Sequence, residues 1–151
     1  MWARLLRFSA LPRLAKALFM RAVLLLPLIT LSLKLRGFRQ TQQLLQRFLH
    51  SDPNVAQGAA IESRVALTSR MVLAAARYSP ISSSCLERSL SIWWLLGRQG
   101  ISTQLRIGVR KAAEKFQAHA WVERDGVAIG EPESPHLHYA AFSKEFSGDA
   151  T

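Results

Sequence analysis

The chain has 151 residues, of which 49% are apolar, so it can bury one core and form one domain with an appendage. A single cysteine, Cys85, excludes an internal disulfide and fits a reducing cytosol, where we expect the protein to reside. The net charge of +10 is no general nucleic-acid signal, because residues 1–50 hold nine Lys and Arg and no acid, whereas the other 101 residues hold eleven bases and ten acids.

Two basic, apolar helices are predicted for the N-terminal third, over residues 3–24 and 28–49, with a break near Pro27. The uncharged run 22–33 is shorter than the ~20 residues that a membrane span needs, and no small-residue cleavage site of a signal peptide follows it. We expect an extra helical layer over the core, and peripheral contact of residues 1–50 with anionic lipid is the alternative. No aromatic residues alternate with the bases, so no nucleic-acid partner is expected.

A loop is predicted over residues 51–60, where Pro, Asn and Gly separate two periodic segments. We therefore divide the chain into an N-terminal extension, residues 1–55, and a second region, residues 56–151. A core helix is expected from about residue 61 to 78, because the proline at position 80 disfavours helix in the residue before it. Its apolar side chains recur at helical intervals: Val65, Leu67, Met71, Val72 and Ala75.

The next helix is predicted to begin at Cys85, within "SPISSSCLERSLSIWWLLGRQG", residues 79–100. Ser84 and Glu87 have the spacing of a capping box, and Gly100 supplies a stop. One face is apolar and carries Leu86, Leu90, Trp93, Trp94 and Leu96. The positive end of the helix dipole favours a thiolate at its first residue. A lone cysteine is more often a small core residue, so position alone leaves both interpretations open.

Strand-like alternation follows over residues 104–110 and again over 116–123. The sequence "RDG", residues 124–126, is typical of a hairpin turn, and "VAIG" begins a third strand. These segments predict an antiparallel meander. His119 lies in the middle strand on the side opposite its apolar residues, where a half-buried packing role is as natural as a chemical one.

A cysteine at a helix start and a histidine on a following strand form the layout of papain-like and transglutaminase-like thiol enzymes. The segments "CLERSLSIWWLLGRQGISTQLRIGVRK" and "FQAHAWVERDGVAIGE" resemble the transglutaminase-like cysteine protease of lasso-peptide biosynthesis, the leader peptidase, over roughly residues 60–140. The resemblance implies an α+β fold with a papain/transglutaminase-like core, in which the nucleophile at a helix N-terminus packs on an antiparallel sheet, plus an N-terminal helical extension.

A Cys-His-acid triad is the site that this resemblance implies. The nucleophile falls on Cys85, in "SSCLERSL", and the base on His119, in "AHAWVE". The acid of the family is usually Asp, and its place is taken here by Glu131, in "AIGEPE". Glu133 and Asp125 are the fallbacks. The thiol and a ring nitrogen of the histidine are expected within about 3 to 5 Å, with Gln117 and Trp121 on the same strand face as candidates to line the cleft.

The expected partners follow from the same resemblance. Larger members of the family begin with a winged-helix module that recognises the leader, whereas residues 1–50 here are basic and helix-like. The resemblance therefore implies the split form, in which a separate leader-recognition protein delivers the precursor peptide and an ATP-dependent macrolactam synthetase closes the ring. No cofactor is expected, because no G-x-x-x-x-G-K-[ST] loop occurs.

Three alternatives stay open at this point. Cys85, His119, His136 and His138 could form a zinc site, although 34 residues separate the first two and match no compact metal motif. The chain could be a membrane-attached scaffold for the synthetase, with a structural Cys85. The same triad could transfer an acyl group to an amine instead of water.

Overall fold

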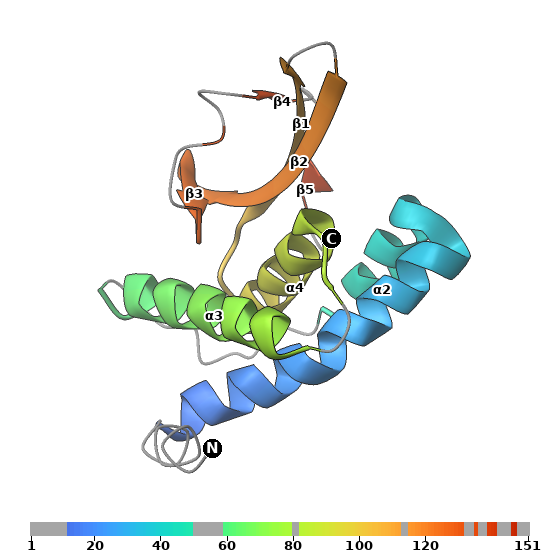
Figure 1. The fold of residues 1–151 in the computed structure, drawn as a ribbon. Helices are drawn as coiled ribbons and strands as arrows, with labels where there is room; N and C mark the ends of the chain where they lie inside the picture. Colours follow the sequence, from blue (N-terminus) through green and yellow to red (C-terminus); the bar gives the residue numbers. More distant parts are fainter. Residues whose placement is uncertain are drawn as a thin grey trace.

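The protein forms a helical layer and a small antiparallel sheet, seen in a computed structural model that describes residues 12–49, 59–79, 82–112, 115–131, 135, 139–141 and 146–147 (Figure 1). The helices are α2 (Arg13–Arg47), α3 (Ala59–Tyr78) and α4 (Cys85–Arg98). The strands are β1 (Gln104–Ala112), β2 (Lys115–Arg124), β3 (Val127–Ile129), β4 (Ala140–Ala141) and β5 (Phe146–Ser147). The α+β class expected from the sequence is confirmed.

The sheet has the order β3-β2-β1-β4, and β5 also pairs with β1. The long β1–β2 pair is antiparallel, with Gly108 opposite His119. The turn between β2 and β3 has positive φ at both central residues, 51° at Asp125 and 76° at Gly126. This is the type I′ geometry that Asp-Gly sequences favour, because its twist matches that of the flanking strands. The predicted meander and its hairpin turn are confirmed.

The break in the N-terminal helix lies at Gly37, and the prediction of a break near Pro27 is wrong. Gly37 has φ 76° and ψ 178°, a conformation that only glycine adopts readily. The side chains of Ser32 and Thr41 meet at 2.9 Å, so the chain folds back after Gly37 instead of continuing straight. Pro27 is tolerated inside the helix because buried neighbours on either side, such as Leu26 and Ile29, anchor it to the core.

The core joins the inner face of α2 to α3, α4 and the sheet. Fully buried Leu26, Leu90 and Leu105 belong to one cluster with Val72 and Val122. The helix expected over 61–78 is confirmed as α3, two residues longer at its start. The helix predicted to begin at Cys85 is confirmed as α4. The proposed boundary at residue 55 lies outside the described residues.

The returning limb of α2 rests on α4. The indole Nε1 of Trp94 donates to the carbonyl oxygen of Leu45 at 3.0 Å. Leu49 lies so close to Gly97 that a Cβ there would stand 2.7 Å from the Cδ2 of the leucine. Because position 97 has no side chain, the end of the Leu49 side chain fits against the backbone of α4.

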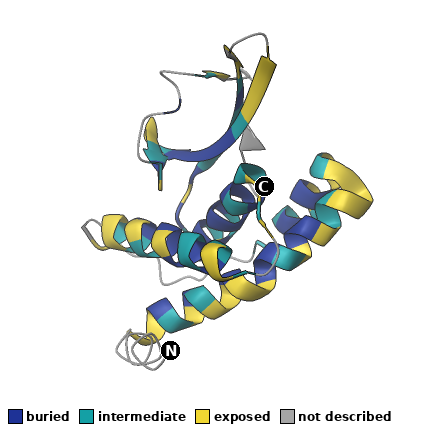
Figure 2. Ribbon diagram, in the orientation of Figure 1, coloured by how far each residue is buried: buried dark blue, intermediate teal, exposed yellow. Residues whose placement is uncertain are grey.

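The first half of β2 extends beyond the core. The sequence pattern placed Phe116 and Ala118 on an apolar, core-facing side, yet Phe116 is 78% exposed and Ala118 is also exposed. Burial begins at Ala120 and continues through Glu123. The strand was predicted correctly, but its burial does not alternate: residues 115–118 are exposed on both faces, and residues 120–123 are buried on both faces (Figure 2).

Candidate active site

Cys85 is the first residue of α4 and is half-buried. The predicted capping box is present: the Ser84 hydroxyl accepts from the backbone N–H of Glu87 at 3.4 Å, and the Glu87 carboxylate accepts from the N–H of Ser84. The N–H of Arg88 donates to the Ser84 carbonyl oxygen at 3.2 Å. The cap therefore fixes the helix start without using the backbone N–H of Cys85, which stays directed out of the helix end.

A hydrogen bond holds the start of α4 against the middle of β2. The hydroxyl of Ser89, one turn after Cys85, donates to the carbonyl oxygen of Ala120 at 2.9 Å, and both residues are buried. Residues four apart on a helix share a face. Because Ala120 directly follows His119, this bond brings the cysteine end of α4 to the part of β2 that carries the histidine, as the two elements lie in Figure 1.

The His119 ring forms a cluster with two other aromatic rings, whose own centroids are 6.4 Å apart. Its centroid is 6.0 Å from that of Trp121, with planes 18° apart, and 5.2 Å from that of Tyr139. Trp121 is fully buried, and its Nε1 donates to Glu123 Oε1 at 2.7 Å, while Arg106 Nε pairs with Glu123 Oε2 at 3.1 Å. These contacts lock the tryptophan, and the tryptophan in turn limits the orientations of the imidazole.

Gly108 makes room for that arrangement from the neighbouring strand. A Cβ at this position would stand 2.9 Å from Trp121 Cη2 and 3.0 Å from the carbonyl oxygen of Ala140. Contacts below 3.0 Å force a shift of one partner. The absent side chain thus allows the indole to lie flat over β1 beside the histidine.

Glu131 is adjacent to the histidine. Its Oε1 is 3.3 Å from His119 Nε2, and the two side chains are 26% and 21% exposed, respectively. Gly130 precedes it with φ 73°, a left-handed conformation that turns the chain after β3. A carboxylate at this distance can orient the imidazole through its far nitrogen and support its protonated form.

The other candidate acids lie elsewhere or are not described. Asp125 sits in the β2–β3 turn, 83% exposed, with its Oδ2 3.7 Å from Arg124 Nε. Glu133 lies outside the described residues. The structure thus brings together His119 and Glu131, and the 3 to 5 Å separation expected between the Cys85 thiol and the imidazole stays a prediction.

Of the two residues expected to line the cleft, Trp121 packs and Gln117 is exposed. Gln117 Oε1 accepts from Arg110 Nε at 2.9 Å, on the projecting part of the β1–β2 pair. Tyr139 and Ser89 were not predicted. Ser89 could have been found from its spacing of four from Cys85, whereas no sequence pattern marks Tyr139, which reaches the site from beyond the third strand.

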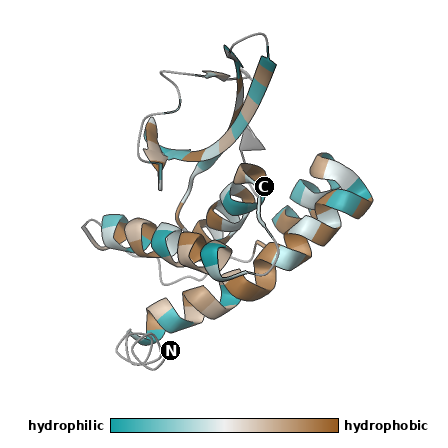
Figure 3. Cartoon of the chain, viewed as in Figure 1, coloured by the Kyte–Doolittle hydropathy of each residue, from teal (hydrophilic) through white to brown (hydrophobic). Residues whose placement is uncertain are grey.

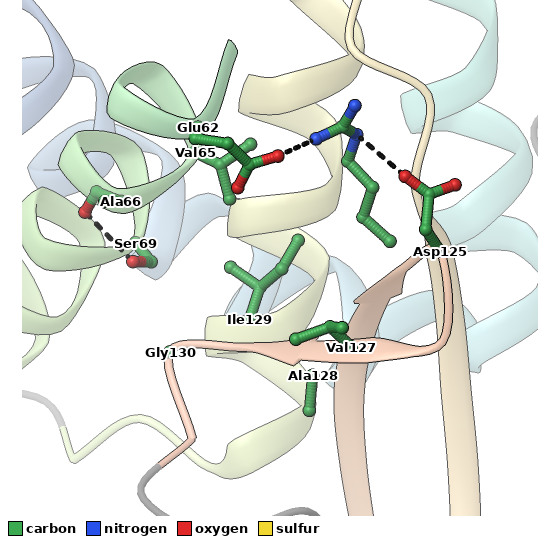
Figure 4. Close-up of a pocket in the computed structure, with 10 residues that line it drawn as sticks. Glu62, Val65, Ala66, Ser69, Asp125, Val127, Ala128, Ile129 and Gly130 are labelled. Carbon is green, nitrogen blue, oxygen red and sulfur yellow. Dashed lines mark hydrogen bonds and ion pairs between the residues drawn. The ribbon is translucent and has the colours of Figure 1, made fainter. Parts of the chain in front are cut away.

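A hollow of about 350 Å³ lies between α3 and β3 (Figure 4). Val65 and Ile129 form its apolar part. Arg124 forms ion pairs with Glu62 and Asp125 at its rim. Gly130, which directly precedes Glu131 in the chain, also lines it, whereas Cys85, His119 and Glu131 are not among its lining residues.

No group of three or more His, Cys, Asp or Glu side chains gathers as a metal site among the residues that the structure describes. His136 and His138, two members of the alternative zinc site, fall outside those residues. Within the described part of the site, the pair His119 and Glu131 is suited to holding a proton, and the Cys85 thiol lies at the start of α4, which the Ser89–Ala120 hydrogen bond joins to β2.

The model of the family described as the transglutaminase-like superfamily matches residues 26–144, which is most of the chain. The chain belongs to the transglutaminase-like superfamily. Members of this superfamily are typically cysteine proteases or acyl transferases. The match begins inside α2 and takes in Cys85, His119 and Glu131. Searches of curated proteins and of solved structures gave no match to the chain.

Proposed function

We propose that this transglutaminase-like protein is a cysteine protease that removes the leader from a lasso-peptide precursor, with Cys85, His119 and Glu131 as its triad. The contact between His119 Nε2 and Glu131 Oε1, 3.3 Å long, is the observation that carries the catalytic assignment. The Ser89–Ala120 bond supports the nucleophile, because it fixes the cysteine end of α4 on the histidine strand. The choice of substrate is supported by the resemblance of the cysteine and histidine segments to the leader peptidase.

The proposed reaction follows from which ring nitrogen is engaged. Glu131 contacts Nε2 of His119, which leaves Nδ1 to accept the thiol proton of Cys85. The thiolate attacks the scissile carbonyl, and the backbone N–H of Cys85 donates to the oxyanion. The imidazolium then gives its proton to the leaving amine as the C–N bond breaks. Water, deprotonated by His119, hydrolyses the thioester and regenerates the thiol.

We propose that a separate protein delivers the precursor peptide to the protease. In the split form that the resemblance implies, a separate leader-recognition protein presents the precursor, and an ATP-dependent macrolactam synthetase uses the released core peptide. We place one substrate side chain in the hollow between α3 and β3, because Gly130, the residue before Glu131, lines it and because it offers an apolar floor with a charged rim. An extended peptide running past β3 would meet both.

Alkylation of the single cysteine tests the dyad without any substrate. Mass spectrometry after iodoacetamide treatment reports Cys85 alone, because the chain has no other thiol. We expect His119→Ala to slow alkylation at neutral pH, since the thiolate loses its base. His136→Ala and His138→Ala are the matched controls and should leave the rate unchanged. A rate that depends on either of those residues and not on His119 would contradict the assignment.

Cleavage of a precursor tests the function itself. Wild-type protein, precursor and recognition protein are incubated, and the products are followed by mass spectrometry. Release of leader and core peptides whose summed mass exceeds that of the precursor by one water supports the protease. Transfer of the acyl group to an added amine identifies the acyl transferase, and intact precursor in the presence of the partner, with no acyl-enzyme, leaves only a scaffold role. Omitting the recognition protein should slow cleavage, because tethering raises the local substrate concentration.

A further inference from the structure

The outward face of α2 carries a line of exposed apolar side chains. They recur at intervals of three and four residues, as one helix face does, and each is between 50% and 73% exposed. We call them the outer stripe: Met20, Leu24, Leu28, Leu31 and Leu35. Isolated exposed leucines are ordinary, but a continuous row along a helix marks an interaction surface.

The fold does not use this row. The opposite face of the same helix supplies Ala22, Leu26 and Ile29 to the core. In Figure 2 the outer edge of α2 is coloured as exposed, and Figure 3 shows hydrophobic residues along the same helix. The helix is therefore apolar on two sides, one packed within the protein and one facing solvent.

Basic residues border the stripe. On a helical projection Arg21 lies on one flank of it, Lys34 on the other, and Arg13 continues its line toward the N-terminus; all three are exposed. Residues 1–50 contain no Asp or Glu. An apolar row edged only by cations is complementary to an apolar surface that carries anions.

A hollow beside the stripe has the same character. It measures about 230 Å³ and lies where Leu24 and Leu28 of α2 meet Trp94 and Arg98 of α4. The Arg98 guanidinium stands over the Trp94 ring at 5.2 Å from its centroid. Tryptophan and arginine both combine an apolar body with a polar end, which suits the boundary between lipid chains and headgroups.

We infer that the outer stripe docks in the plane of an anionic lipid bilayer, with its leucines among the acyl chains and its bordering bases at the headgroups. A second copy of the chain is a poorer occupant, because it would bring an equally basic border against this one. A membrane-spanning arrangement of α2 also fits the structure less well than in-plane docking. By length and composition α2 could cross a membrane, but 33% of its most apolar window is buried within the protein, and crossing would remove Leu26 and Ile29 from the core. In-plane docking keeps the fold intact.

Vesicle sedimentation tests this inference on the full chain. The vesicles are pure phosphatidylcholine, or phosphatidylcholine with phosphatidylglycerol at about 7:3, each in low and high salt. We expect binding to the anionic vesicles that weakens with salt. Arg21→Gln with Lys34→Gln should lower the partition coefficient about 30-fold, since each base near such a surface contributes about fivefold. The triple variant Leu24→Ser, Leu28→Ser and Leu31→Ser should lose most of the vesicle binding.

The control carries the same charge change elsewhere. Arg70→Gln with Arg77→Gln alters two exposed bases of α3 and should leave binding nearly unchanged. Circular dichroism and Cys85 alkylation check that each variant is folded. The inference is overturned by equal loss in the control, by equal binding to neutral vesicles, or by binding that survives alkaline carbonate, which indicates spanning. If the wild type self-associates but does not bind vesicles, and the leucine variant is monomeric, the stripe is assigned to a second copy of the chain instead.

Discussion

Gly108→Ala tests whether the glycine opposite His119 is the space that the locked tryptophan requires. The new Cβ would stand 2.9 Å from Trp121 Cη2 and 3.0 Å from the backbone oxygen of Ala140. Neither partner yields easily, because the indole is fully buried and hydrogen-bonded to Glu123, and the oxygen belongs to the backbone of β4. Overpacking of this kind costs about 1 to 3 kcal/mol.

The expected net effect is smaller than the steric cost. Replacing a strand glycine by alanine returns about 0.5 to 1 kcal/mol of backbone entropy, which leaves a loss of up to about 2.5 kcal/mol. For a chain of this size each kcal/mol lowers the midpoint of thermal unfolding by about 2 to 4 °C, so a drop of up to about 10 °C is expected. Urea unfolding followed by tryptophan fluorescence gives the free energy directly.

Gly97→Ala is the matched control. Its Cβ would approach even closer, 2.7 Å, but the atom it meets is the Cδ2 of Leu49, the free end of a flexible side chain. The variant should be neutral or slightly more stable, because alanine is the better helix former by up to about 1 kcal/mol. Adding Trp121→Phe to Gly108→Ala should cost less than the sum of the single changes, since the smaller ring relieves the clash. A Gly108→Ala variant more stable than the wild type, or strict additivity in the pair, would refute the steric argument.

Further changes test other parts of the molecule. Cys85→Ser should fold normally and lose cleavage by orders of magnitude, because the hydroxyl is a far weaker acid than the thiol; cleavage at the wild-type rate excludes the thiol mechanism. Glu131→Gln should also fold, and its cleavage rate should stay about two orders of magnitude above that of Cys85→Ser, since the amide reaches the imidazole without stabilising its charge. Full activity of Glu131→Gln would mean that another acid is the third member of the triad. Gly37→Ala should lower the free energy of unfolding by about 1 to 3 kcal/mol in a urea titration, purely through backbone strain, because no atom lies within 4 Å of its Cβ position; an unchanged midpoint contradicts this. Ala66→Trp, on the exposed side of α3, should partly fill the hollow between α3 and β3 and raise KM more than it lowers kcat, whereas an unchanged KM would remove that hollow from substrate binding.

Local signals in the sequence were sufficient for the elements that carry the site. The Ser84–Glu87 spacing predicted where α4 begins, because both partners of a capping box lie within four residues. The Asp125–Gly126 pair predicted the β2–β3 turn for a similar reason, since positive φ at two adjacent residues is encoded by those residues themselves. Both features depend on short segments, so tertiary structure could not overturn them.

The errors arose where distant contacts decide the outcome. Pro27 carries a local penalty, yet burial of its neighbours keeps the helix continuous through it, and the chain bends at Gly37, where Ser32 and Thr41 can meet. Periodicity alone could not reveal this, because the apolar pattern continues past the glycine. Tyr139 was missed for the same reason: its place beside His119 depends on how the chain returns to the sheet, and no residue near it in the sequence signals that return.

The pairing of both C-terminal strands with β1 sets the order in which the protein can be completed during synthesis. Gly108 and Val109 pair with β4, and Gln104 and Leu105 pair with β5, so one edge of β1 finds its partners only when residues 140–147 emerge. A nascent chain that has reached Glu131 already holds His119 and its carboxylate neighbour, but it presents an open strand edge to its surroundings. Such an edge is a template for pairing with other chains. Ribosomal stalling or early termination between Glu131 and the last strand would therefore yield an aggregation-prone product, not a slower version of the mature protein.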